Sequence, residues 1–320
     1  LNAWLVETKD FSLNATFNIG HNKNKIDKLA SGEKEWILTS AWRNDVVNSD
    51  DYRAYVGGTS GLIYGYVNDG FYTVADFESF DSKSRTWKLK DGVVDSSPLS
   101  DTPRPGNAKF KKLTPVDPNS TNPYQLTEAD RTVIGNTTPK FSGGFGLNAT
   151  YKGFDMSMFF NFMYDFDVLN ANKIMLTTWA DNKENNFLMD IASDKRWRNF
   201  DDMGNEIRYS PEVLAEFNKN ATMWNPTSIG RPICMSYAVE DGSFLRLNSA
   251  TLGYTLPSVW TKKVGLSKVR FYVSGNNLFT LTGYSGYDPE VNIATGLTPN
   301  IDYNRYPRSR TYTFGAQLTF

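Results

Sequence analysis

The sequence predicts an all-β fold, namely a segment of a large antiparallel transmembrane β-barrel with long extracellular loops. Three observations lead to this prediction. Several segments of about ten residues alternate apolar and polar side chains, as membrane-spanning β-strands do. The polar side chains between the apolar ones are small and almost uncharged. Tight turns at one end alternate with connections of tens of residues at the other, which compact soluble domains seldom contain.

The clearest pattern runs from Phe141 to Tyr164, as two strands joined by a turn at Lys152-Gly153. From 141 to 151 the odd positions are apolar or glycine, and from 154 to 164 the even positions are apolar. This period of two places the apolar side chains on one face of the pleat. The other face carries Ser, Gly, Asn and Thr, with Asp155 as its only charge. We therefore expect the apolar face to contact lipid and the polar face to line a wet interior.

The length of these strands also fits a bilayer. Each spans 11 residues, and at about 3.3 Å per residue with a tilt of about 40° it projects to ~28 Å, close to the ~25 Å apolar band of outer-membrane barrels. Aromatic residues end both strands, where interfacial girdles are expected. Taken alone, the hairpin also fits a half-buried strand pair in a soluble β-protein.

The same reading extends along the chain. The phase changes within Phe244–Thr255, which predicts a β-bulge there. The long connection 165–237 contains two helix-like pieces, Val168–Trp179 and Ser210–Phe217, and the second begins with Ser at the N-cap and Pro at the first helical position. Residues 79–130 read mostly as loop with short strands. Further strands are expected at 11–20, 36–42, 57–72 (with bends), 269–277 and 311–320.

Composition and charge exclude several functions. A net charge of −1 and a pI near 6.0 give no electrostatic basis for binding nucleic acid. The single cysteine, Cys234, has no partner for a disulfide or a thiolate metal site, and the single histidine, His21, is expected to be a solvated residue at a strand end. We expect no enzymatic activity, no cofactor and no metal.

Six motifs, in order along the chain, resemble the SusC/RagA-type TonB-dependent transporters of Bacteroidota. One of them is the acidic, glycine- and leucine-containing stretch Val239–Pro257, and another is the terminal strand. The resemblance covers nearly the whole chain and corresponds to the C-terminal part of the family barrel. The motifs are YGYVNDG (64–70), DRTVIG (130–135), YKGFD (151–155), VEDGSFLRLNSATLGYTLP (239–257), RFYVSGNNLFTLTGYSGYDPE (270–290) and YTFGAQLTF (312–320).

This resemblance implies how the protein works. Residues 1–320 would form the C-terminal part of the barrel, with the plug and the N-terminal barrel strands outside this chain. A SusD-like surface lipoprotein would close over the extracellular mouth and hold an oligosaccharide or a peptide, and TonB would act through the plug. The barrel-assembly machinery would insert the chain into the lipid of the outer membrane, in a Gram-negative cell of the Bacteroidota type.

Candidate contacts to substrate or lid come from loop aromatics and one acid. Flat aromatic faces stack on sugar rings, and a carboxylate binds hydroxyl groups. Packing within the loops explains the same residues equally well. The candidates are Trp179, Trp197, Trp224, Tyr237 and Asp288.

Two other functions remain open at this point. The runner-up is a soluble β-sandwich module that binds glycans. The third is a glycosidase that uses acids such as Glu240-Asp241, Asp201-Asp202 or Asp288 with Glu290. Neighbouring acids on a strand point to opposite faces, so we expect these carboxylates to accept backbone N–H groups in loops instead.

Overall fold

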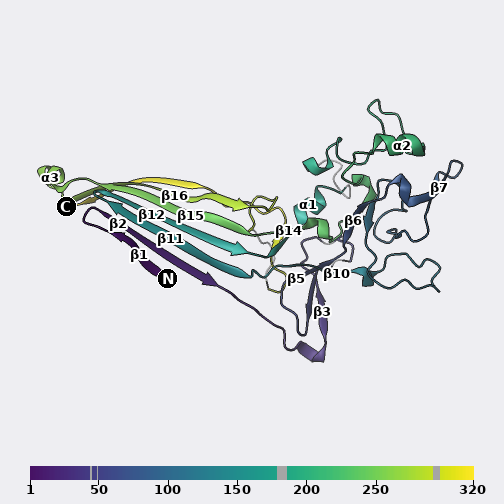
Figure 1. Ribbon diagram of the computed structural model, residues 1–320, viewed down its shortest axis with the longest axis horizontal. Coiled ribbons are helices and arrows are strands. Elements are labelled where there is room, and N and C mark those ends of the chain that lie inside the picture. Colours follow the sequence, from purple (N-terminus) through teal and green to yellow (C-terminus); the bar gives the residue numbers. More distant parts are fainter. Residues whose placement is uncertain (44, 49, 179–185, 291–295) are drawn as a thin grey trace.

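The fold is described from a computed structural model of the 320-residue chain. The structure describes residues 1–43, 45–48, 50–178, 186–290 and 296–320. Figure 1 shows two parts: a long, curved antiparallel sheet and, at one end of it, a layer of loops and short elements. We call the first part the barrel sheet. The second, which comprises the described residues within 21–140, 165–243 and 283–310, is called the loop layer.

Seven strands form the barrel sheet, each hydrogen-bonded to its neighbours in antiparallel order. At the end where the chain terminus Phe320 lies, tight turns and one longer connection (256–267) join the strands, and the loop layer joins them at the other end (Figure 1). In spatial order the strands are β1 (Asn2–Glu7), β2 (Phe11–Gly20), β11 (Phe141–Tyr151), β12 (Phe154–Tyr164), β15 (Phe244–Thr255), β16 (Lys268–Thr282) and β18 (Thr311–Thr319).

The strands with a clear period of two lie where the sequence predicts them, including both strands of the central hairpin. The predicted bulge in β15 is confirmed, because the register shifts between Leu247 and Ser249 and leaves Asn248 without a ladder partner. Strand β1 was not predicted from the sequence. Its register shifts between Trp4 and Val6, so its apolar residues do not alternate.

The two faces of the barrel sheet differ as expected. One row crosses five strands through Phe17, Phe145, Phe160, Leu247 and Phe279, which are register partners in turn. The rings of Phe145 and Phe160 are stacked, with centroids 4.5 Å apart. Phe17 and Phe279 are 41% and 39% exposed. Leu247, next to Phe279 in the row, is 7% exposed. The apolar row is therefore continuous across the five strands, and its two end members are open to their surroundings.

Small residues on the opposite face make room for large neighbours. A Cβ at Gly144 would lie 2.9 Å from the ring of Phe159, and a Cβ at Gly253 would lie 2.4 Å from the guanidinium of Arg270. Arg270 reaches across Gly253 and donates a 2.9 Å hydrogen bond to Asp155. Glycine thus allows side chains to lie flat against the polar face.

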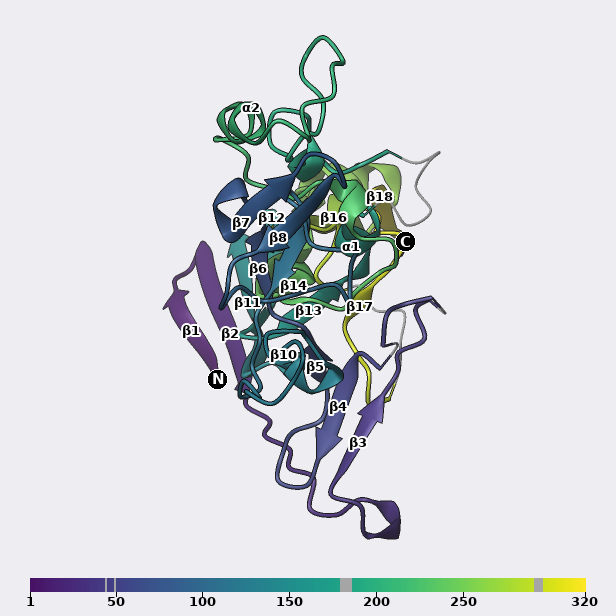
Figure 2. The ribbon, with the colours of Figure 1, turned by 90° about the vertical axis from the view of Figure 1, so that its right-hand side faces the viewer.

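Short sheets build the loop layer. Figure 2, which looks onto this layer, shows the β3–β4 pair and helix α2 on opposite sides of it. Its strands are β3 (Glu35–Leu38), β4 (Tyr52–Tyr55), β5 (Leu62–Gly65), β6 (Asn68–Phe71), β7 (Phe77–Asp81), β8 (Thr86–Leu89), β9 (Ala108–Phe110), β10 (Thr132–Asn136), β13 (Asp167–Asn170), β14 (Val239–Asp241) and β17 (Ile301–Asp302). Its helices are α1 (Ala171–Met175) and α2 (Pro211–Phe217), and α3 (Ser258–Thr261) lies in the β15–β16 connection.

The predicted helix over Val168–Trp179 is wrong in its first part. Residues Asp167–Asn170 form β13, because Leu169 pairs with Val239 of β14 and with Ile301 of β17. Only Ala171–Met175 is helical, and Trp179 lies outside the described residues. The second predicted helix is confirmed as α2, with Pro211 at its first position, although the Ser210 side chain forms no cap hydrogen bond.

The hydrophobic cores lie in the loop layer. The described residues form four buried apolar clusters, and of their buried members only Phe244, the first residue of β15, belongs to the barrel sheet. The largest side chains in these clusters include Trp224, Tyr52 and Phe110, all less than 2% exposed. The loop layer is thus a folded body with its own core, and it holds its surface residues in place.

Among the described residues, no helix has both the length and the apolar character needed to cross a bilayer.

Candidate functional site

The structure describes four of the five predicted contact residues and does not gather these four at one site. Trp197 and Trp224 are 2% and 1% exposed, Tyr237 is half-buried and Asp288 is 5% exposed. Trp179 lies outside the described residues. Only Trp224 and Tyr237 contact each other, with ring centroids 4.8 Å apart at 76°. In this conformation the two described tryptophans present little ring surface to a ligand, and their role as contacts stays a prediction.

Trp224 and Tyr237 form an anchored pair inside the loop layer. The Trp224 indole donates a 3.2 Å hydrogen bond to the carbonyl of Thr177, and the Tyr237 hydroxyl donates one of 3.1 Å to Asp190. Burial, together with the nearby charge of Asp190, raises the pKa of the Tyr237 hydroxyl, which therefore stays protonated. This pair braces the loops rather than opening into a cavity.

Asp288 belongs to a buried ion network. Its carboxylate accepts a 2.5 Å hydrogen bond from Arg246 of β15, and the same guanidinium lies 3.2 Å from Glu290. On the other side of this network, the Arg308 guanidinium lies 3.4 Å from the Glu290 carboxylate. The network fastens the loop after β16 to the end of β15. Both acids are occupied by arginine, so they do not flank a site for a glycosidic bond.

A second polar network is centred on Glu240 of β14. Its carboxylate accepts hydrogen bonds from Asn170 at 3.0 Å and from both the backbone and the hydroxyl of Ser285 at 3.0 and 2.8 Å. Lys173 lies 3.4 Å away, and its ammonium also sits over the Tyr237 ring at 4.3 Å. Glu240 thereby joins β13, α1 and the loop after β16.

The other acids considered as catalytic also serve in loops. Asp201 accepts backbone N–H groups from Met203 and Asn205, and Asp241 accepts one from Ser243. Asp288 accepts one from Glu290 as well. The expectation that these carboxylates accept backbone N–H groups is confirmed for Asp201, Glu240, Asp241 and Asp288, whereas Asp202 and Glu290 pair with arginine side chains. Within the described ranges, no group of three or more His, Cys, Asp or Glu side chains is placed to hold a metal ion.

A depression of about 360 Å³ opens beside the Glu240 network. Tyr287, which is 84% exposed, and Arg305 stand at its wall, and neither was singled out from the sequence. The sequence offered one clue to Tyr287, because Gly286 and Tyr287 directly precede the candidate residue Asp288 in the same loop. Its lining offers amides, an ammonium, a guanidinium and a phenol ring, which suit a polar ligand: Asn170, Asn172, Lys173, Leu176, Leu188, Ser285, Gly286, Tyr287, Asn304 and Arg305.

The known proteins to which this chain is similar are of one kind. No family model matches the chain. TonB-dependent receptor P3 of Formosa agariphila is 31% identical over 326 residues, which cover 100% of this chain and 28% of the relative. TonB-dependent receptor SusC of Bacteroides thetaiotaomicron is 25% identical, over 100% of this chain and 26% of that protein. The chain thus spans little more than a quarter of the length of these relatives.

Solved structures agree on the fold. The RagAB peptide transporter matches with a TM-score of 0.64 and 21% identity, over 100% of this chain and 28% of that chain. The RagAB peptide importer in its closed-closed state matches with a TM-score of 0.62. At this identity the likeness concerns the fold. With the sequence relatives, it leads to one conclusion: the chain belongs to the SusC/RagA-type TonB-dependent transporters and corresponds to the C-terminal part of their β-barrel.

Proposed function

We propose that this chain forms part of the wall and the extracellular loops of an outer-membrane importer. The observation that carries the proposal is the row from Phe17 to Phe279, an apolar surface that crosses five strands and is not covered by any of the four hydrophobic clusters. In a soluble sandwich such a face would be the core. Here the cores lie in the loop layer, so hydrocarbon is the partner that fits the exposed face.

The proposed cargo is an oligosaccharide or a peptide. The similarity to TonB-dependent receptors supports import driven by TonB, and RagAB is a peptide transporter. The depression beside Glu240 has the polar lining and the exposed Tyr287 ring that either kind of cargo needs. The loop layer would contact cargo first and pass it to the polar face of the barrel sheet.

The proposed partners follow from the same assignment. A SusD-like surface lipoprotein would cover the loop layer, and TonB would act through a plug outside this chain. The barrel-assembly machinery would insert the strands into the lipid of the outer membrane, in a Bacteroidota-like cell. Trp179, Trp197, Trp224, Tyr237 and Asp288 remain candidate contacts, with Tyr287 and Arg305 added from the geometry.

The test uses the full-length transporter that contains this chain, tagged in its native cell. We expect it in the outer-membrane fraction, with a heat-modifiable shift on a gel and with a surface lipoprotein that copurifies. A deletion strain should lose growth on one oligosaccharide or peptide and regain it with the intact gene. A chain that is folded and soluble in buffer supports the glycan-binding sandwich. Substrate hydrolysis that is lost on Asp288→Asn while the heat-modifiable shift is kept supports a glycosidase.

A further inference from the structure

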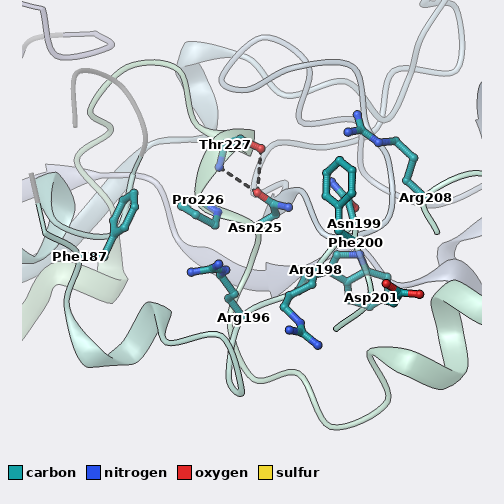
Figure 3. A pocket seen from close by; sticks show the side chains of 11 residues that line it. Phe187, Arg196, Arg198, Asn199, Phe200, Asp201, Arg208, Asn225, Pro226 and Thr227 are labelled. Atoms are coloured by element: carbon teal, nitrogen blue, oxygen red, sulfur yellow. Dashed lines mark hydrogen bonds between the residues drawn. The ribbon is translucent and has the colours of Figure 1, made fainter. Parts of the chain in front are cut away.

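Two adjoining pockets in the loop layer, near α2 and β7, are lined by arginines. The larger has a volume of about 410 Å³ and is shown in Figure 3. The smaller shares Asn199, Arg208 and Thr227 with it. We call the two together the arginine pocket. Its arginines come from four separate loop segments and are Arg85, Arg104, Arg196, Arg198 and Arg208.

The positive charge of this pocket is only partly neutralised. Arg198 lies 2.7 Å from Asp202, and Arg208 pairs with Glu206. No carboxylate forms an ion pair with the other three arginines among the residues that the structure describes. Like charges gathered on one wall repel each other and attract an anion. The whole chain has a net charge of −1, so this local excess is not a consequence of composition.

Two acids line the pocket, and one is already engaged. Both carboxylate oxygens of Asp201 accept hydrogen bonds within their own turn, from the N–H groups of Met203 and Asn205 and from the Asn205 amide, at 2.8 to 2.9 Å. Asp101 lines the smaller pocket. With Asp202 and Glu206 counted, five guanidinium groups lie beside four carboxylates. The guanidinium groups of Arg85, Arg104 and Arg196 have no carboxylate partner among the described residues, and this favours a negatively charged ligand.

The remaining lining suits a sugar ring. Phe200 is 46% exposed and has the guanidinium of Arg208 5.5 Å from its centroid. Asn225 and Thr227 add an amide and a hydroxyl. The buried Trp197, which also lines the larger pocket, carries an indole N–H with no acceptor among the described residues. The volume lies in the range of roughly 300–1,000 Å³ typical of small-ligand sites.

We propose that the arginine pocket binds a sugar unit that carries a carboxylate or a sulfate group, so that acidic oligosaccharides are the cargo. A guanidinium binds such groups through two parallel N–H donors, and the Phe200 ring supports the sugar face. The inference rests on the proposed function. An acidic peptide fits less well, because the backbone of Phe200 and that of Arg196 are already paired, with Glu206 and Met223.

The test measures binding to the full-length transporter, purified in detergent with its lid lipoprotein, by calorimetry. The probes are a galacturonic acid tetramer, the same tetramer fully methyl-esterified, a sulfated galactose tetramer and a tetraglutamate peptide. We expect one of the two acidic sugars to bind at least about tenfold more tightly than the ester. The tighter binder of the two shows whether the pocket prefers a carboxylate or a sulfate group.

Variants then assign the binding to the pocket. Arg196→Gln with Arg208→Gln should weaken the acidic sugar by roughly tenfold to a hundredfold, since each removes a charge-assisted hydrogen bond. Arg196→Lys with Arg208→Lys keeps the charge and should weaken it less. Arg310→Gln, at an exposed arginine outside both pockets, is the matched control and should leave the affinity unchanged.

The inference is overturned if neither acidic sugar binds more tightly than the ester, or if tetraglutamate binds more tightly than both, and neither comparison needs a variant. The inference is also overturned if the variant with Arg196→Gln and Arg208→Gln keeps both its heat-modifiable shift and its affinity for the acidic sugar. Should the transporter import a neutral oligosaccharide or a peptide in any of these cases, the proposed function stands while this inference fails. A chain that does not fractionate with the outer membrane contradicts the proposed function itself.

Discussion

The guanidinium of Arg246 donates a 2.5 Å hydrogen bond to the carboxylate of Asp288, and the two side chains are 1% and 6% exposed. One residue lies on barrel strand β15 and the other in the loop that follows β16. The pair therefore fixes part of the loop layer to the barrel sheet. Because both charges are buried, removing one of them leaves the other without its main partner.

Asp288→Asn should release this loop. Loss of one partner of a buried ion pair costs about 3–5 kcal/mol, and Glu290, at 3.2 Å from Arg246, compensates only in part. Hydrogen exchange of the segments 284–290 and 296–302 should become faster in the variant. Asp69→Asn is the control, because Asp69 forms an exposed pair with Lys111 at 3.9 Å, worth at most about 1 kcal/mol. Equal protection in the two variants contradicts this role.

Gly106→Ala should destabilise the arginine pocket. Gly106 has a φ of +90°, and an added Cβ would lie 2.2 Å from the Trp197 ring. The positive φ alone costs a non-glycine residue about 1–2 kcal/mol, and the ring contact adds to this. Gly92→Ala separates the two effects, since Gly92 has a φ of +82° and nothing within 4 Å. Protease cleavage after Arg196 and Arg198 should be faster in the first variant than in the second.

The segment 113–131 should lose protection in acid. Burial alone would raise the pKa of Asp130, but hydrogen bonds from Thr114, Thr127 and Leu113 outweigh it and hold the pKa well below its usual value of 3.8. A carboxylate whose pKa is lower in the folded than in the unfolded protein stabilises the fold at pH values above its unfolded pKa. This contribution falls as the pH drops below about 4. Hydrogen exchange, corrected for its intrinsic pH dependence, should show the loss.

At neutral pH, Asp130→Asn should have the same effect as acid. The amide cannot accept all the N–H groups that converge on the carboxylate, which costs about 1–3 kcal/mol. Asp117→Asn, in an exposed turn where one N–H is bound, should change little. If protection of 113–131 is identical in the two variants, Asp130 does not organise this segment.

The sequence predicts the barrel sheet better than the loop layer, for a physical reason. Along β11 and β12 the position of a residue in the alternating pattern predicts the face of the sheet on which its side chain lies, because the strand geometry itself sets the period of two. Strand β1 escapes this rule because a register shift between Trp4 and Val6 breaks the alternation. In the loop layer, Val168 and Leu169 look helical locally, yet pairing with distant strands makes them β13.

The sequence predicts the types of residue at the candidate site, but it does not predict which of them are buried or lie together. Aromatic and acidic residues do gather in the loop layer, as the sequence indicates. Whether a ring is buried depends on contacts with distant segments, such as Gly106 beneath Trp197 or Thr177 beside Trp224. Arg85, Arg104 and Arg208 are far apart in the chain, so no local pattern shows that they share a wall.

In the proposed function, one face of the barrel sheet contacts lipid and the other contacts water. Leu147 and Asn148 are neighbours near the middle of β11 and point to opposite faces. A nitroxide attached to Leu147→Cys or Asn148→Cys in the full-length protein, reconstituted in bilayers, measures this directly. We predict that the label at 147 collides mainly with dissolved oxygen and the label at 148 mainly with a water-soluble nickel chelate. If both labels give the same preference, or if the label at 147 is shielded from both reagents, the apolar face does not contact lipid and the proposed function is wrong.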